Sequence, residues 1–155
     1  RELRHLVGDW VFGCNICQDV CPVNRKAAVG REPAFRQRHD FAAPQLLPLL
    51  EMTDDDFRQR FRGSAIKRAK RAGLQRNVCV ALGNIGDRSA VPALATALGT
   101  KEPLVRRHAA WALGRLGGDE AEAALVGALA DETDVEVVEE LEVALAELSA
   151  ARHSE

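Results

Sequence analysis

Three cysteines lie within a span of eight residues near the start of the chain, and they are Cys14, Cys17 and Cys21. Their spacing is C-x2-C-x3-C-P. Thiolates packed this densely are soft ligands that suit iron and sulfide, and a cysteine followed directly by proline ends the ligand run of bacterial ferredoxins. In that run the first three cysteines bind one 4Fe-4S cluster and the last binds a second. The spacing therefore predicts ligands for two 4Fe-4S clusters.

The motif is one ligand short of the ferredoxin run, because Val11 stands where the first cysteine of that run would be. We therefore expect Cys14 and Cys17 to bind one cluster with help from cysteines outside this chain. Cys21 is expected to be the fourth ligand of the other cluster, which is also completed from outside.

Two other interpretations of the three cysteines remain open. One is a zinc site that adds His5 or His39 as a ligand, and the other is a set of reduced cysteines without any metal. The fourth cysteine, Cys79, lies in the apolar stripe of a predicted helix, where Ala110 is its counterpart one repeat later. We expect Cys79 to be a core residue.

The second half of the chain repeats with a period of 31 residues. Residues 76–86 read RNVCVALGNIG and residues 107–117 read RHAAWALGRLG, so the Ala-Leu-Gly core and the final glycine are in register. A third copy, at 141–148, has lost its glycines. Each unit is expected to be a pair of short helices whose apolar stripes are buried only when neighbours stack. The repeat predicts a solenoid similar to HEAT repeats.

The chain is therefore expected to be mostly α-helical and to have three parts. These are the C-terminal part of a ferredoxin-like 4Fe-4S domain (1–24), a connector with at most short helical turns (25–56) and a HEAT-like repeat domain (57–155). Because Arg1 leads straight into the cysteine motif, we expect a C-terminal part of a longer protein. No stretch has the length of a membrane-spanning helix, so we expect a cytoplasmic protein, without a membrane partner and monomeric.

The net charge of −2 conceals two segments of opposite sign. Residues 57–76 contain eight basic residues and no acidic one, whereas residues 118–155 contain twelve acidic residues and one arginine. The first segment can meet phosphate and the second would repel it. Within the basic segment, Ser64 is expected to cap a helix over 65–72 that Gly73 closes, which would place Lys67, Lys70 and Arg71 on one face.

Two stretches carry a resemblance to a known family. They are GDWVFGCNICQDVCPVN at 8–24 and FRGSAIKRAKRAGLQRNVCVALGN at 61–84. Both resemble epoxyqueuosine reductase, a cobalamin-dependent enzyme family of tRNA queuosine synthesis that also carries a HEAT-like C-terminal domain. The resemblance implies that two 4Fe-4S clusters feed electrons to cobalamin, which removes the epoxide oxygen of epoxyqueuosine in the tRNA anticodon loop.

The resemblance also implies roles for single residues. Cys14 and Cys17 match ligands of the cluster nearer the corrin, and Cys21 matches the last ligand of the other cluster. The catalytic acid and most of the corrin pocket of the family lie upstream, so we expect no catalytic residue here and no activity of this chain alone. Trp10 and Phe12 are expected either to shield a cluster or to pack against the corrin. Cobalamin contacts are expected from Asp9, Trp10, Val11 and Phe12.

The expected partners are the anticodon stem-loop of tRNA, the upstream catalytic domain and an electron donor. Positioning contacts with the RNA backbone are expected from Arg62, Lys67, Arg68, Lys70, Arg71 and Arg76. The alternative for these side chains is a solvated basic face paired with Glu51 and with the aspartates at 54–56. In the second repeat we expect Trp111 to be a core residue and His108 to be exposed or hydrogen-bonded.

Two competing functions remain. One is a different cobalamin and iron-sulfur reductase, such as a reductive dehalogenase, whose cysteine blocks look similar. The other is a HEAT-repeat module that binds a protein partner and holds zinc.

Overall fold

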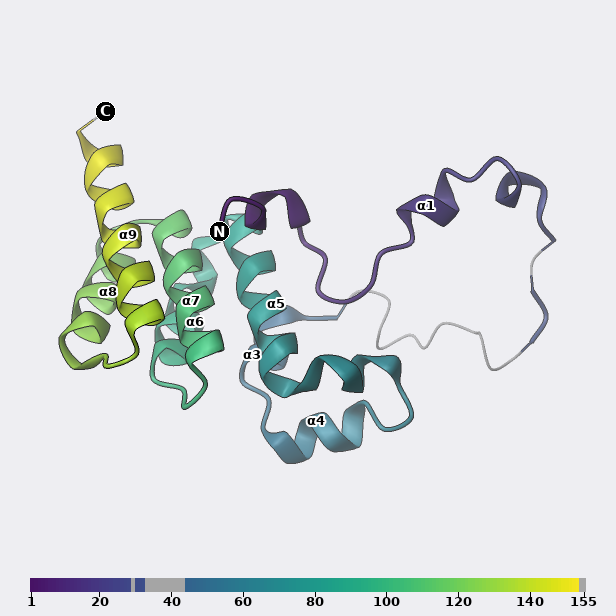
Figure 1. Ribbon diagram of the computed structural model, residues 1–155, viewed down its shortest axis with the longest axis horizontal. Coiled ribbons are helices and arrows are strands. Elements are labelled where there is room, and N and C mark those ends of the chain that lie inside the picture. Colours follow the sequence, from purple (N-terminus) through teal and green to yellow (C-terminus); the bar gives the residue numbers. More distant parts are fainter. Residues whose placement is uncertain (29, 33–43, 154–155) are drawn as a thin grey trace.

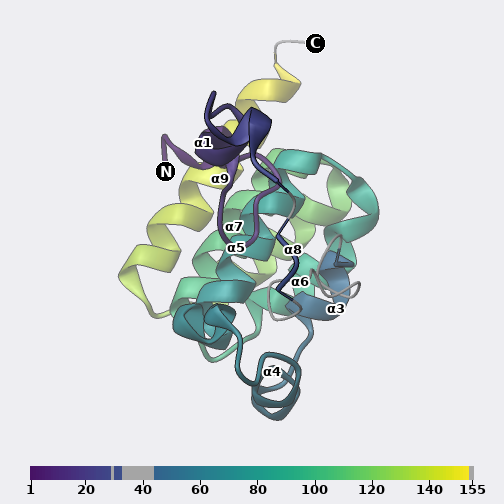
Figure 2. The ribbon, with the colours of Figure 1, turned by 90° about the vertical axis from the view of Figure 1, so that its right-hand side faces the viewer.

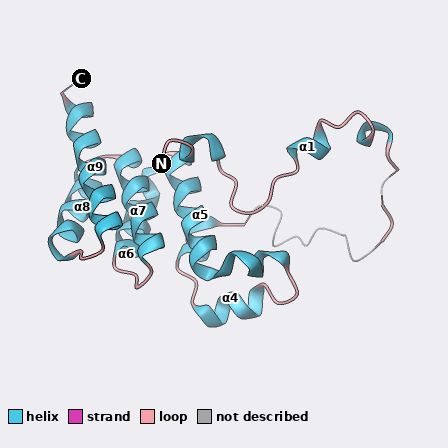
Figure 3. Ribbon diagram, in the orientation of Figure 1, coloured by secondary structure: helices cyan, strands magenta, loops and turns pink. Residues whose placement is uncertain are grey.

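The computed structural model describes residues 1–28, 30–32 and 44–153, and every regular element within them is a helix (Figure 3). In these described ranges the 3-10 helices are η1 (Arg4–Val7), η2 (Asn24–Lys26), η4 (Ala65–Ala69) and η5 (Arg88–Ala90). The α-helices are α1 (Ile16–Asp19), α3 (Leu46–Leu50), α4 (Asp54–Arg60), α5 (Lys70–Ile85), α6 (Val91–Leu98), α7 (Pro103–Leu116), α8 (Asp119–Asp131) and α9 (Val135–Arg152). Among these helices none combines the length and apolar character needed to cross a membrane.

The helices stack in two layers (Figures 1 and 2). Helices α5, α7 and α9 pack side by side in one layer, and α3, α6 and α8 line the other. Successive helix pairs bury one continuous apolar core between the layers, as stacked repeats must do. The predicted helical solenoid of the HEAT type is confirmed.

Two glycines, one in each full repeat, allow the helices of the first layer to approach closely. A Cβ atom on Gly83 would lie 2.8 Å from Cζ3 of Trp111, and one on Gly114 would lie 2.9 Å from Cβ of Ala144. The glycine of the Ala-Leu-Gly core therefore marks the contact of each helix with the next. Helix α9 is the last helix of this layer in the described part of the chain, which accounts for the loss of glycine from the third copy.

The helical packing begins before residue 57, inside the range predicted as a connector. The side-chain amide of Gln75, which is buried in α5, donates to the carbonyls of Leu50 at 2.6 Å and Met52 at 3.3 Å. Phe57 and Phe61 are buried with their ring centroids 5.1 Å apart. Helix α3 is thus the second-layer partner of α5, and α4 is joined to the same core.

For the helix predicted over residues 65–72, the N-terminal cap is confirmed and the C-terminal end is wrong. The hydroxyl of Ser64 accepts a hydrogen bond from the amide of Ile66 at 3.2 Å. The helix that follows is a 3-10 helix that stops at Ala69, and Lys70 then adopts a positive φ of 58°. Gly73 lies inside α5 and is buried, because the apolar stripe of α5 already begins around it.

Two predictions for the repeat helices are confirmed. Cys79 is fully buried in the core, where burial raises the pKa of its thiol to about 12. Trp111 is buried between α5 and α7. His108 is buried and hydrogen-bonded rather than exposed: its Nδ1 lies 2.8 Å from the carbonyl oxygen of Leu104.

Candidate cluster-ligand and nucleic-acid sites

The cysteine-bearing loop extends away from the helical array after η1 (Figure 1). Cys14 and Cys17 are exposed and Cys21 is half-buried. The loop is organised by local contacts, since Asn24 donates a side-chain hydrogen bond to the carbonyl of Gln18 at 3.0 Å. The thiols of Cys14 and Cys17 are therefore accessible to a metal cluster or to another domain.

The cysteines do not gather around one ion. In the described ranges, no group of three or more His, Cys, Asp or Glu side chains has the arrangement of a metal site. The zinc interpretation that adds His5 is not supported by this geometry, and His39 lies outside the described residues. The donor set of the loop, two exposed cysteines and a half-buried third, fits ligation of iron-sulfur clusters that another domain completes.

A cavity of about 800 Å³ lies between the cysteine loop and the helical array. Its apolar wall includes Leu49, Phe61 and Leu74. Residues 9–15 of the loop also line it, and Arg60 adds a charged side chain to the lining. Cavities of this size and character accommodate organic cofactors and ligands.

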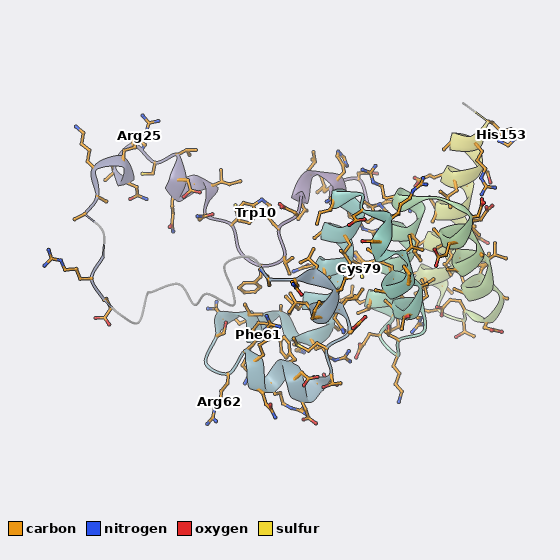
Figure 4. The ribbon with its side chains drawn as sticks, turned by 180° about the vertical axis from the view of Figure 1, so that it is seen from behind. Trp10, Arg25, Phe61, Arg62, Cys79 and His153 are labelled. Carbon is orange, nitrogen blue, oxygen red and sulfur yellow. The ribbon has the colours of Figure 1, made fainter. Side chains whose placement is uncertain are left out.

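The residues predicted to contact cobalamin line this cavity. Val11 is partly buried and packs against the core, whereas Trp10 and Phe12 remain 41% and 42% exposed. Figure 4 shows Trp10 where the loop leaves the array. Within this chain the two aromatic rings therefore leave large apolar faces uncovered. Gly13, with φ of 78°, then turns the backbone toward Cys14.

Two asparagines of α5 hold the start of the loop. The side-chain amide of Asn77 donates to the carbonyl of Val11 at 2.7 Å. The amide of Asn84 donates to the carbonyls of Arg4 at 2.9 Å and Gly8 at 2.8 Å. These contacts join residues 4–11 to the first repeat.

Arg4 fastens the same segment to the second and third repeats. Its guanidinium is buried, lies 5.6 Å from the ring centroid of Trp111 and forms an ion pair with Glu140 of α9 at 2.9 Å. Burial lowers the pKa of Arg4, and the carboxylate of Glu140 opposes this shift. Arg1 also pairs with Glu140, and with Glu147 at 2.7 Å.

Four of the six cations predicted to contact RNA are exposed and form no ion pair with any described residue. They are Arg62, Lys67, Arg68 and Lys70. Figure 4 shows Arg62 pointing away from the helical body. Because Lys70 has a positive φ, it does not continue one helical face with Lys67, contrary to the prediction. The four charges instead surround the turn between α4 and α5.

Arg71 and Arg76, the other two cations, are half-buried and have different surroundings. Arg71 lies 2.7 Å from a carboxylate oxygen of Asp54 and donates to the amide oxygen of Gln75 at 2.8 Å. The alternative interpretation, pairing with the upstream acids, is therefore correct for Arg71. The charge of Arg76 acts on His108: burial lowers the pKa of His108 to about 4, and the charges of Arg4 and Arg76 add to this effect.

The family model of HEAT repeats matches residues 63–146, more than half of the chain. The chain belongs to the HEAT-repeat family. This membership agrees with the 31-residue period and with the two-layer stacking of helix pairs.

The HEAT-repeat chain is also similar to curated enzymes over nearly its whole length. It is 33% identical to an epoxyqueuosine reductase of Bacillus cereus over 142 residues, which is 91% of this chain and 37% of that protein. It is 38% identical to the epoxyqueuosine reductase of Escherichia coli over 114 residues, which is 73% of this chain and 30% of that protein. The chain thus spans less than half the length of these relatives.

Solved structures give the same result. A crystal structure of epoxyqueuosine reductase with an epoxyqueuosine-modified tRNA stem loop matches 96% of this chain and 40% of that one, with a TM-score of 0.89 and 32% identity. The structure of epoxyqueuosine reductase from Streptococcus thermophilus matches 96% of this chain and 40% of that one, with a TM-score of 0.77 and 31% identity. The resemblance inferred from the two sequence stretches is confirmed.

Sequence reasoning missed the residues by which the HEAT repeats hold the loop. Asn77 and Asn84 are seven residues apart in α5, so they lie on the same side of the helix two turns apart. Two polar side chains at that spacing beside an apolar stripe were the signal that could have revealed them. Arg4 gave no signal of its own, because its partner Glu140 is far away in the sequence.

Proposed function

We propose that this chain provides the cluster-ligand loop and the RNA-contacting repeats of a cytoplasmic epoxyqueuosine reductase, which reduces epoxyqueuosine to queuosine in the anticodon loop of tRNA. The observation that carries the proposal is the likeness of 96% of the chain to a solved epoxyqueuosine reductase with its modified tRNA stem loop. This likeness includes both the cysteine loop and the repeats, whereas a protein-binding HEAT module requires no cysteine loop.

Cys14 and Cys17 are proposed to ligate one 4Fe-4S cluster and Cys21 the other, each completed by cysteines of the upstream catalytic domain. The exposure of Cys14 and Cys17 supports this role, because ligands from another domain must reach the same iron atoms. When bound, the clusters supply electrons one at a time, and cobalamin supplies the reduced cobalt that removes the epoxide oxygen. The thiolates of this chain hold the iron and, through their surroundings, tune its potential.

The backbone and side chains of Asp9, Trp10, Val11 and Phe12 are proposed to form one wall of the cobalamin site. Three features support this role: the cavity of about 800 Å³, the exposed rings of Trp10 and Phe12, and the position of Cys14 at its edge. A corrin seated against these rings would exclude water from the side of the cluster. In this arrangement Trp10 and Phe12 would both pack against the corrin and shield the cluster from water, so the two expected roles are compatible.

The exposed cations Arg62, Lys67, Arg68 and Lys70 are proposed to contact phosphates of the tRNA anticodon stem-loop. Such contacts fix the position of the RNA and carry no base recognition. Arg71 is proposed to stabilise the segment between α4 and α5 (61–69) and not to contact RNA itself, because its guanidinium already pairs with Asp54. Arg76 extends the basic surface beside His108. We also propose that the protein is a monomer, and that its other partners are the upstream catalytic domain and an electron donor.

The cluster assignment is tested by iron and cobalt analysis of the whole protein after anaerobic reconstitution with iron, sulfide and cobalamin. We expect about eight irons and one corrin per chain, and a loss of roughly four irons in the double variant Cys14→Ala, Cys17→Ala. The control Cys79→Ala should keep all the iron, because Cys79 is buried in the repeat core. Zinc in place of iron, or equal iron in all three proteins, would contradict the assignment.

A further inference from the structure

We propose that Asn77 and Asn84 are positioning residues, which hold the cysteine-bearing loop at a fixed place on the HEAT array. The role of the loop in binding clusters rests on the proposed function, whereas its attachment by the two asparagines does not. It gives the repeats a second task beyond contact with RNA, namely to set where Cys14 and Cys17 stand.

The two asparagines bind three carbonyls of a segment that is distant in sequence. Asn84 donates from its side-chain amide to Arg4 at 2.9 Å and to Gly8 at 2.8 Å. Asn77 donates to Val11 at 2.7 Å, three residues before Cys14. Because both donors stand on one rigid 16-residue helix, the segment is held at two points two turns apart.

Apolar burial contributes little to the attachment of residues 1–7. Leu3 and Leu6 are 71% and 70% exposed, and Val7 is also exposed. Among residues 1–7 only Arg4 is buried, whereas Val11 farther along is partly buried against the core. Residues 1–8 are therefore attached mainly by polar contacts, namely the hydrogen bonds from Asn84 and the ion pairs of Arg1 and Arg4 with α9. Asn77 adds the contact with Val11.

The combination of contacts joins the loop to all three repeats. The asparagines belong to α5, Trp111 under the Arg4 guanidinium belongs to α7, and Glu140 belongs to α9. A ligand loop must be placed within a fraction of an ångström for its thiolates to share a cluster with cysteines of another domain. Release of the anchors should therefore alter the cluster as well as the loop.

Replacement of asparagine by aspartate tests the inference, because it keeps the side-chain size and removes the amide donor. In the whole protein, the double variant Asn77→Asp, Asn84→Asp should exchange backbone amide hydrogens in residues 3–12 at least about tenfold faster than the parent. Each single variant should show a smaller increase. The reconstituted double variant should also show a changed electron paramagnetic resonance spectrum of the reduced cluster.

The matched control is Thr96→Val, which removes a side-chain hydrogen bond that stays inside α6, from the hydroxyl to the carbonyl of Pro92. This variant should leave both measurements unchanged. Exchange at 3–12 as slow in the double variant as in the parent would overturn the proposal. If the parent binds no iron, the proposed function fails, and the exchange rates still decide whether the asparagines hold the loop.

Discussion

His108 is a buried imidazole surrounded by positive charge. Arg4, Arg76 and Arg107 all disfavour its protonated form, while its contact with the carbonyl of Leu104 favours that form. Burial is the largest cause of the lowered pKa, about 4 against an ordinary value of 6.5. Between pH 6.5 and about 4, His108 is therefore protonated in the unfolded chain and neutral in the folded chain. Acid in this range favours the unfolded state.

We predict that the free energy of unfolding is highest above pH 6.5 and falls by up to about 3 kcal/mol as the pH drops from 6.5 to 4. Urea denaturation at a series of pH values measures this loss. His108→Gln should remove most of the slope in this window, while the exposed control His153→Gln should keep it. Equal slopes in both variants would assign the acid sensitivity to other groups.

At lower pH a second group contributes. Two hydrogen bonds from Arg106, at 2.7 and 2.8 Å, lower the pKa of Glu132 to about 2. The stabilisation by this carboxylate is present above pH 4.5 and disappears as the pH falls from there toward 2. The windows of Glu132 and His108 overlap only between pH 4.5 and 4.

At the scale of the elements, the repeated glycine decides how closely the helices approach. A methyl group on Gly83 or Gly114 would meet atoms of the neighbouring helix at less than 3 Å, with backbone atoms of that helix only slightly farther away. The helices would have to separate to make room, which loosens the core packing on either side.

We predict that Gly83→Ala and Gly114→Ala each lower the free energy of unfolding by about 2 to 3 kcal/mol. The matched control is Gly127→Ala in α8, where no atom lies within 4 Å of the added methyl group. That variant should be neutral or more stable by up to about 1 kcal/mol, because alanine favours helix. Urea denaturation distinguishes the two outcomes, and equal effects at all three positions would contradict the close-approach explanation.

The sequence predicted these elements where a pattern was local and repeated. The 31-residue period indicated the helix pairs, and the position of Cys79 in the apolar stripe indicated its burial. The prediction failed at Gly73, because a glycine after basic residues looks like a helix end and only the packing of α5 shows that it is interior. The sequence allowed a short helix such as α3 in the connector, but it gave no signal for the packing of α3 against α5 or for the hydrogen bond from Gln75 to Leu50.

At the scale of the whole molecule, the anchors of the cysteine loop lay beyond sequence reasoning. The hydrogen bonds from Asn77 and Asn84 join residues 66 to 80 positions apart, and no local pattern specifies such pairs. The spacing of the cysteines, by contrast, predicted that the three thiols would not form one complete site. That expectation stays a prediction, which the iron analysis of the whole protein tests.

The distribution of charge over the molecule leads to a prediction for RNA binding. Replacement of Lys67, Arg68 and Lys70 by alanine in the whole protein should weaken binding of an anticodon stem-loop and flatten its salt dependence. The slope of log K against log salt should fall by about one for each phosphate that the variant no longer binds. The matched control, Glu139→Ala with Glu142→Ala on acidic α9, should retain the parent slope. An unchanged slope in the lysine and arginine variant would remove the α4–α5 turn from the RNA interface.

Conversion of the modified base by the whole protein decides whether the proposed function is correct. Reconstituted with iron, sulfide and cobalamin and supplied with a reductant, the protein should convert epoxyqueuosine in tRNA to queuosine, detected by mass spectrometry of the digested RNA. Cys14→Ala should abolish the conversion, and Cys79→Ala should retain it. Absence of queuosine from a parent protein that holds its iron and corrin would contradict the proposed function.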